Sequence, residues 1–194
     1  MAQQLRLLIA DDEAIIRMNL RESLEELGYL VIGEANEGLS AVNMARQLRP
    51  DLVILDVKMP RMDGISAAKI IQDEQIAPVI LLTAYSGAEL VAQARDAGVS
   101  SYLVKPFHSG ELLPAIEITR VRWAERRNRS EEIKHLSEQI ETRKIIERAK
   151  GYLMDSQNLK EAEAFRKIQQ LAMNSRKTMK EVAQAILLAQ QISA

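Results

Sequence analysis

Residues 52–60 read Leu-Val-Ile-Leu-Asp-Val-Lys-Met-Pro, an apolar run that ends in one carboxylate and then in a proline. Four consecutive large apolar residues, preceded by Pro50, predict a short strand that is buried on both faces. Such strands belong to parallel sheets, which helices cover on both sides. Asp56 is therefore the first residue of this run to leave the core.

Three other apolar runs also end at polar residues. They are Leu7–Ala10 before Asp11 and Asp12, Val79–Leu82 before Thr83, and Tyr102–Val104 before Lys105. Parallel strands that are joined by helices place their carboxyl ends on one edge of the sheet, where open α/β folds bind their ligands. We therefore expect the polar side chains of all four strand ends to converge on one site.

Segments with helical periodicity separate the apolar runs. Helices are predicted over residues 14–27, 37–49, 64–77 and 86–98, and a short strand over 30–33. Strands that alternate with helices through right-handed crossovers form a doubly wound parallel sheet. The fold class predicted for the first part of the chain is α/β with five parallel strands.

The composition sets limits on the function. Of the 194 residues 47% are hydrophobic and none is cysteine, so disulfides and thiolate metal sites are excluded. The apolar runs are much shorter than the roughly 18 residues of a membrane helix. The N-terminus Met-Ala-Gln-Gln also lacks the features of a signal peptide. We expect a cytoplasmic protein that does not act on membranes.

The second half of the chain differs from the first in charge and in pattern. Residues 1–108 contain 10 Lys or Arg and 15 Asp or Glu, whereas residues 109–194 contain 16 and 12. One long helix is predicted after Ser109, because no proline or glycine interrupts residues 115–150. A short coiled-coil seam is indicated by the spacing of Ile133, Leu136 and Ile140.

The C-terminal residues predict a compact helical unit. Helices are expected over 159–174 and 179–191, each after a capping-box spacing: Asn158 with Glu161, and Thr178 with Glu181. The apolar positions of the first of these helices are Ala162, Phe165, Ile168, Leu171 and Ala172. The predicted domains are an α/β domain over 1–120, a helical or coiled-coil linker over 121–142 and an all-α three-helix domain over 143–194.

The carboxylates at the predicted strand ends would repel one another unless a cation offsets their charge. Mg²⁺ takes oxygen ligands from carboxylates and usually shares its site with a phosphate. With the ammonium of Lys105 and the hydroxyl of Thr83, the pocket suits a phosphoryl group, and Asp56 is the candidate nucleophile. The alternative is that acidic residues follow strands because loops are polar, which suits Asp51, Asp63 or Asp73 taken singly.

Residues 1 to about 120 resemble the receiver domain of two-component response regulators. The motifs that carry the resemblance are Asp11-Asp12, 55–60 (Leu-Asp-Val-Lys-Met-Pro), 62–64 (Met-Asp-Gly), 82–84 (Leu-Thr-Ala) and 103–107 (Leu-Val-Lys-Pro-Phe). The resemblance implies a flavodoxin-like sheet with strand order 2-1-3-4-5. It also implies a phosphoacceptor for a sensor histidine kinase rather than an enzyme, with at most Mg²⁺-dependent self-phosphorylation and dephosphorylation.

The same resemblance implies roles for single residues. Mg²⁺ would be held by Asp11, Asp12, Asp56 and the backbone carbonyl of Lys58. Asp56 would accept the phosphoryl group, and Lys105 and Thr83 would contact it. Tyr102 stands where the family has its switch aromatic, although a lone Tyr on a short strand is otherwise ordinary edge packing. A phosphate that draws the Thr83 hydroxyl inward would vacate space for the Tyr102 ring.

Residues 143–190 resemble the ANTAR domain, the RNA-binding module of AmiR- and NasR-type antitermination regulators. The motifs are 149–151 (Ala-Lys-Gly) with 153–154 (Leu-Met), 164–165 (Ala-Phe) with Ile168, 172–177 (Ala-Met-Asn-Ser-Arg-Lys), and 182–183 (Val-Ala). On composition alone, residues 143–154 are an amphipathic helix with a solvated basic side. The resemblance implies binding to paired RNA stem-loops that compete with a transcription terminator.

Candidate RNA-binding residues follow from this resemblance. Unpaired bases stack on aromatic side chains, and basic side chains meet phosphates. The candidates are Arg148, Ala149, Lys150, Gly151, Tyr152, Arg176 and Lys177. We expect a homodimer, formed on phosphorylation, to engage the two stem-loops.

Three functions remain open at this point. The first is a phosphorylation-activated transcription antiterminator that binds RNA. The second is a DNA-binding response regulator, although the expected last helix has few base-reading side chains beyond Lys180 and Gln184. The third is a phosphorylation-controlled protein-interaction module without nucleic-acid output.

Overall fold

The computed structural model describes residues 4–84, 97–99 and 101–193. The chain divides into two compact units, Met1–Arg126 and Arg127–Ala194. Helix α5 (Ser109–Gln157) contributes its first part to unit 1 and its remainder to unit 2. The helix predicted over 86–98 lies outside the described residues, apart from its last two positions.

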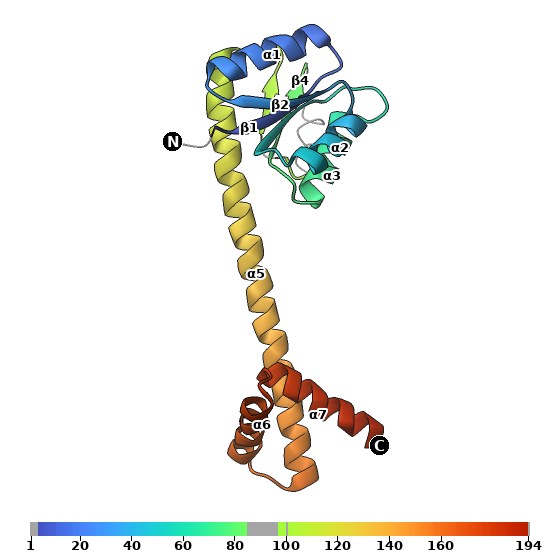
Figure 1. Cartoon of the computed structure of the whole chain (residues 1–194), viewed down its shortest axis with the longest axis vertical. Coiled ribbons are helices and arrows are strands. Elements are labelled where there is room, and N and C mark those ends of the chain that lie inside the picture. Colours follow the sequence, from blue (N-terminus) through green and yellow to red (C-terminus); the bar gives the residue numbers. More distant parts are fainter. Residues whose placement is uncertain (1–3, 85–96, 100, 194) are drawn as a thin grey trace. The chain divides into compact units, whose positions relative to one another are not determined.

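Unit 1 contains a five-stranded parallel sheet (Figure 1). Its strands are β1 (Arg6–Ala10), β2 (Leu30–Ala35), β3 (Leu52–Asp56), β4 (Val79–Thr83) and β5 (Ser101–Val104). All pairings are parallel, and the strand order is β2-β1-β3-β4-β5. The predicted fold class and strand order are confirmed.

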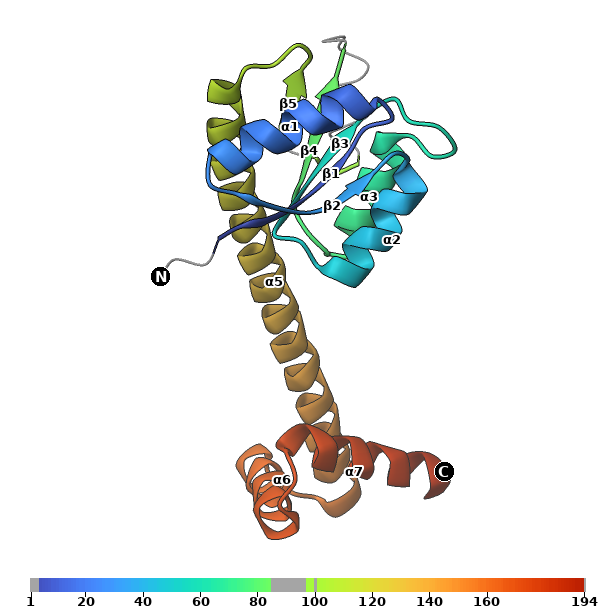
Figure 2. The ribbon, with the colours of Figure 1, turned by 45° about the horizontal axis from the view of Figure 1, so that its top comes forward.

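Helices cover both faces of this sheet (Figure 2). Helix α1 (Ala14–Glu26) and the beginning of α5 lie on one face, and α2 (Gly38–Leu48) and α3 (Gly64–Asp73) lie on the other. Alternate residues of β1 pack against the two layers, because Leu7 and Ile9 belong to the core under α1, whereas Leu8 and Ala10 belong to the core under α2 and α3. Burial on both faces explains why the central strands β1, β3 and β4 are almost entirely apolar.

Strand β2 is two residues longer than predicted, because it ends at Ala35 and not at Gly33. A Cβ atom at Gly33 would lie 2.8 Å from Met44 Cε and 2.9 Å from Leu48 Cδ1. The glycine therefore lets α2 pack closely on the strand and does not end it. The sequence pattern alone marked this glycine as the strand's end.

Helix α5 is 49 residues long and includes Pro114 near its beginning. It passes through Gly151 and ends at Gln157. The predicted domain boundaries after residues 120 and 142 both fall within α5 and stay a prediction. In the part of the chain that the structure describes, no helix is long and apolar enough to span a membrane.

The end of α5 packs in unit 2 with α6 (Glu161–Ser175) and α7 (Met179–Ser193). Their shared core contains Ala149, Leu153, Ala164, Ile168, Ala172, Val182 and Ala183. The predicted apolar face of α6 is only partly buried, because Phe165 is 43% and Leu171 is 41% exposed. The buried stripe repeats every fourth residue from Ala164, so these two larger side chains lie beside it.

One of the two predicted capping boxes is present. The Thr178 N–H donates to Glu181 Oε2 at 2.7 Å, and the Glu181 N–H donates to Thr178 Oγ1 at 3.2 Å. The prediction at Asn158 is wrong, because Asn158 has a φ of 53° and α6 begins only at Glu161. An N-cap residue needs extended backbone geometry, which a left-handed residue does not have.

Candidate functional site

The acidic residues that follow the predicted strands converge in unit 1. Asp11 follows β1 and is fully buried, Asp56 ends β3 and is 6% exposed, and Asp12 is exposed. One carboxylate oxygen from each of the three lies within 4.8 Å of the other two. The parallel register brings them together, because β1 and β3 are direct neighbours in the sheet.

Lys105 places a positive charge among these carboxylates. Its Nζ lies 2.5 Å from Asp11 Oδ2 and 2.5 Å from Asp56 Oδ1. Its backbone is held by β4, because the Lys105 N–H donates to the Thr83 carbonyl at 2.7 Å. The three carboxylates of this cluster outnumber the one ammonium between them by two charges.

Burial and the neighbouring charges together shift the pKa values of Asp56 and Lys105. Burial raises the pKa of Asp56, the hydrogen bond and charge of Lys105 oppose the rise only in part, and the charge of Asp11 adds to it. Burial alone would lower the pKa of Lys105, but its hydrogen bonds to Asp11 and Asp56 raise it above the ordinary value. The ammonium therefore stays charged in a pocket that still lacks positive charge.

The loop after β3 is held against Asp56 by backbone contacts. The Lys58 N–H donates to Asp56 Oδ2 at 2.8 Å, and the Gly64 N–H donates to the Val57 carbonyl at 2.9 Å. A Cβ atom at Gly64 would collide with the Asp56 carbonyl, so only glycine permits this approach. Asp63 caps α3 by accepting from the Ser66 N–H at 2.7 Å. Sequence reasoning identified Gly64 as the start of a helix and as part of a receiver motif, and it missed this contact.

A cavity of about 240 Å³ lies at the same edge of the sheet. It is lined by Asp12, Glu13, Asp56, Val57, Lys58, Thr83, Ala84 and Lys105. Thr83 is buried, whereas Tyr102 is 44% exposed on the neighbouring strand β5. The structure thus brings together every residue predicted for this pocket and leaves much of the Tyr102 ring in solvent.

Two of the predicted RNA-binding residues belong to the interior of unit 2. Ala149 is fully buried, and Lys150 is 8% exposed. The Lys150 Nζ lies 2.6 Å from Glu147 and 2.7 Å from Glu161, so it connects α5 with α6. Its hydrogen bonds to Glu147 and then Glu161 raise the pKa of Lys150. Packing and ion pairing therefore occupy these two side chains.

The other candidates are more accessible. Arg148, Arg176 and Lys177 are exposed, and Gly151 and Tyr152 are half-buried. A pocket of about 610 Å³ is lined by Arg148, Gly151, Tyr152, Asp155, Ser156 and Leu187. Three of the predicted residues thus share one concave surface. Asp155, Ser156 and Leu187 also line it, and sequence reasoning did not predict them as RNA-binding residues.

Two protein families match the chain. The response regulator receiver domain matches residues 7–117, and the ANTAR domain matches residues 134–187. The transcriptional regulatory protein PdtaR of Mycobacterium tuberculosis strain H37Rv is 52% identical over 182 residues, which are 94% of this chain and 89% of PdtaR. The chain belongs to the response regulators with a receiver and an ANTAR domain.

Solved receiver domains resemble unit 1 of this response regulator. The response regulator domain of Thermotoga maritima CheB is 31% identical with a TM-score of 0.56, and the match covers 61% of this chain and 97% of that one. A chain of the CheX–CheY–BeF3–Mg²⁺ complex from Borrelia burgdorferi is 28% identical with a TM-score of 0.55, covering 58% and 86%.

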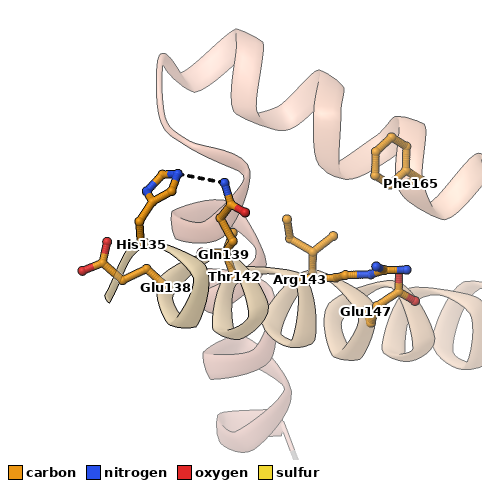
Figure 3. Close-up of a pocket in the computed structure, with 8 residues that line it drawn as sticks. His135, Glu138, Gln139, Thr142, Arg143, Glu147 and Phe165 are labelled. Carbon is orange, nitrogen blue, oxygen red and sulfur yellow. Dashed lines mark hydrogen bonds between the residues drawn. The ribbon is translucent and has the colours of Figure 1, made fainter. Parts of the chain in front are cut away.

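The ANTAR domain of this response regulator has a second concave surface, between α5 and α6 (Figure 3). It measures about 510 Å³ and is lined by His135, Glu138, Gln139, Thr142, Arg143, Ile146, Glu147 and Phe165. Phe165 projects from α6 across the groove from Arg143 and Glu147 of α5. Arg143 and Glu147 continue the spacing of the predicted coiled-coil seam, and the groove overlaps the apolar part of that seam along α5, because His135, Glu138 and Gln139 also line it.

Proposed function

We propose that this response regulator is activated by phosphorylation of Asp56 and acts as a transcription antiterminator through RNA binding by its ANTAR domain. The observation that carries the proposal is the pocket at the end of β3, where the Asp56 carboxylate lies beside Lys105 and lines a cavity of about 240 Å³. A regulator with this pocket and an ANTAR domain couples a phosphoryl signal to an RNA output.

Mg²⁺ is the metal that fits the acidic pocket. One divalent ion would offset the excess of carboxylates in the cluster of Asp11, Asp12, Asp56 and Lys105, and carboxylate oxygens are ligands that Mg²⁺ prefers. Asp11, Asp12 and Asp56 would hold the ion together with the backbone carbonyl of Lys58. When bound, the ion offsets the charge of the phosphoryl oxygens. The Mg²⁺ and BeF3 named for the Borrelia burgdorferi complex support this assignment.

The proposed reaction transfers a phosphoryl group from a phosphohistidine of a sensor kinase. An oxygen of Asp56 attacks phosphorus, an O–P bond forms, the N–P bond breaks, and the electron pair leaves with the imidazole. The Lys58 N–H, at 2.8 Å, and the Lys105 ammonium, at 2.5 Å, orient the two Asp56 oxygens. Lys105 is also close enough to contact the incoming group and stabilise its negative charge.

Thr83 and Tyr102 would convert the added charge into a change of packing. Thr83 lines the cavity, so a phosphoryl group on Asp56 would draw its hydroxyl toward the cavity. Tyr102 is 44% exposed in this structure, and its ring would then move into the space that Thr83 vacates. The surface of β5 would change, and with it the surface available for dimerisation.

The proposed RNA contacts lie at the pocket that contains Tyr152. An unpaired base would stack on the Tyr152 ring, and Arg148 would meet a phosphate beside it. Arg176 and Lys177 are exposed at the end of α6 and provide a second basic position. We assign Ala149 and Lys150 an indirect role, because burial and ion pairing support a function in holding α5 against α6.

Dimerisation would place two ANTAR domains on two stem-loops. The seam residues Ile133, Leu136 and Ile140 are 61%, 50% and 57% exposed in the single chain, and burial of these side chains against a second copy is favourable. Two linked modules bind two linked sites far more tightly than either module alone. This seam is short, so we expect the phosphorylated receiver to supply a second contact.

A comparison of nucleic acids tests the RNA output. Phosphorylated full-length protein is titrated with a leader RNA that carries tandem stem-loops, and with duplex DNA of the same sequence. We expect tighter binding to the RNA and increased read-through of a terminator in a transcription assay. Preference for the duplex would instead identify a DNA-binding regulator, and binding to neither would leave a protein-interaction module.

A further inference from the structure

Arg17 of α1 contacts the backbone of the acidic loop that follows β1. Its Nη1 donates to the Asp11 carbonyl at 2.7 Å and to the Asp12 carbonyl at 3.4 Å. The Arg17 side chain is only 18% exposed. One guanidinium thus reaches the two consecutive peptide groups whose side chains belong to the acidic cluster.

Other hydrogen bonds hold Asp11 itself, in addition to those that Arg17 makes to the loop. The Asp11 N–H donates to the Ala35 carbonyl at 3.2 Å, and Asp11 Oδ1 accepts from the Glu13 N–H at 3.0 Å. Asp11 is therefore fixed by β2 and by its own turn, whereas Asp12 is exposed at the pocket. A guanidinium that is bound to both carbonyls limits the rotation of the peptide that joins the two residues.

Glu34 of β2 offsets the charge of Arg17. The Arg17 Nε lies 3.6 Å from Glu34 Oε2, and Arg21, one turn further along α1, has its Nε 3.1 Å from Glu34 Oε1. An unpaired cation near a metal site weakens metal binding by repulsion. With Glu34 as a partner, Arg17 supplies hydrogen bonds to the loop at a smaller electrostatic cost.

We propose that Arg17 is a positioning residue for the metal site: it holds the Asp11–Asp12 peptide so that both carboxylates are already arranged for Mg²⁺. The proposal rests on the metal site of the proposed function. Its physical basis is preorganisation, because an ordered loop loses less conformational entropy when the ion binds. Groups that orient metal ligands commonly change metal affinity by tenfold or more when they are removed.

An effect of charge and an effect of positioning predict opposite changes in Mg²⁺ affinity when Arg17 is replaced. Arg17→Met removes a cation near an acidic site, so electrostatics alone would tighten Mg²⁺ binding. Positioning predicts weaker binding, because the loop loses its two hydrogen bonds. Arg21→Met is the matched control, since it removes an arginine that contacts the same Glu34 and, among the hydrogen bonds of the described residues, makes none to the loop.

The test is calorimetric titration of the unphosphorylated full-length chain with MgCl2. We expect Arg17→Met to weaken binding about tenfold, Arg17→Lys to weaken it less, and Arg21→Met to leave it unchanged or slightly tighter. Circular dichroism in EDTA checks that each variant is folded. If Arg17→Met is unfolded, the Mg²⁺ affinities of Arg17→Lys and Glu34→Gln are measured in its place. Glu34→Gln removes the negative partner of Arg17 but keeps the hydrogen bonds from Arg17 to the loop. We therefore expect this variant to bind Mg²⁺ more weakly at low salt, through charge repulsion, and normally at high salt.

The outcomes separate this proposal from the one on which it rests. Equal or tighter Mg²⁺ binding by Arg17→Met, with normal binding by the wild type, overturns the role of Arg17 alone. Absence of Mg²⁺ binding by the wild-type chain overturns the metal site, and the role of Arg17 with it. Equal weakening by Arg17→Met and Arg21→Met would show a general effect of α1 and would also overturn the positioning role.

Discussion

Lys105 of the receiver domain and Lys150 of the ANTAR domain each lie between two carboxylates. Lys105 lies 2.5 Å from Asp11 and from Asp56, whose side chains are 0% and 8% exposed. Lys150 lies 2.6 Å from Glu147 and 2.7 Å from Glu161, whose side chains are 52% and 71% exposed. Both lysines form two short ion pairs, but the carboxylates around Lys105 are buried and those around Lys150 are exposed.

The surroundings decide what each lysine can do. The carboxylates around Lys105 are buried, and with exposed Asp12 they outnumber its single positive charge, which is why we propose that this pocket takes up a cation and, with it, a phosphoryl group. Those around Lys150 are exposed to water, which screens the interaction and weakens each ion pair. Lys150 thus forms exposed ion pairs that connect α5 with α6, whereas Lys105 lies among the buried carboxylates of the proposed phosphorylation site.

Substitution of Asp56 should have the largest effect on the receiver side of this comparison. Asp56→Asn removes the proposed nucleophile, so incubation with Mg²⁺ and a small phosphodonor such as acetyl phosphate should add no phosphoryl group. Mass spectrometry should find one added group on the wild type and on the control Asp73→Asn, which changes an exposed carboxylate of α3. Labelled Asp56→Asn protein would contradict the assignment.

Exchange of each lysine for methionine tests the comparison directly. Lys105→Met should slow phosphorylation about 100-fold, as the loss of one group that stabilises developing charge commonly does. Lys150→Met should leave the rate unchanged, because its ion pairs lie in the other domain. Initial rates with a small phosphodonor measure both. Similar losses in the two variants would refute the distinction between them.

Substitutions at the proposed RNA-binding surface test the ANTAR side of the comparison. Arg148→Ala should lower RNA affinity and reduce the slope of log K against log salt by roughly one, because one phosphate contact is lost. Tyr152→Ala should lower affinity about tenfold with the slope nearly intact, because stacking releases few ions. Filter binding over a salt series distinguishes these effects.

Two controls accompany the RNA measurement. Lys144→Ala removes an exposed basic side chain of the same helix outside the Tyr152 pocket, and we expect little change. Lys150→Met should keep the wild-type salt slope if Lys150 serves packing. A smaller slope for Lys150→Met would return Lys150 to the RNA contacts and would break the contrast with Lys105.

The smallest expected effect concerns the pH dependence of the α5–α6 connection. The hydrogen bond from Lys150 lowers the pKa of Glu161, so its contribution to stability is present above the unfolded carboxyl pKa of about 4.3 and is lost as the pH falls through the lower folded value. Hydrogen exchange of α6 amides should be faster in Glu161→Gln than in the wild type near neutral pH. Below about pH 4 the difference should fade; a constant difference would contradict the ion pair as its cause.

The fold of unit 1 and its acidic pocket were predictable from the sequence. Runs such as Leu52–Leu55 are apolar at every position because helices cover both faces of the sheet, and parallel topology then brings the strand ends together. Asp11, Asp56, Thr83 and Lys105 met at one edge for this reason. The end of β2 was less predictable, because Gly33 serves the packing of α2, and so was the start of α6, because Asn158 has a left-handed backbone that the sequence does not reveal.

The tertiary structure decided what periodicity leaves open. The basic residues near Gly151 follow a helical pattern, but only the position of α6 determines that Lys150 meets Glu161, eleven residues away, while Arg148 faces a pocket with Leu187. The hydrogen bonds of Arg17 likewise depend on how α1 packs beside the loop after β1. Hydrophobic periodicity specifies which residues are buried, whereas charge pairing across elements depends on distances that exist only after packing.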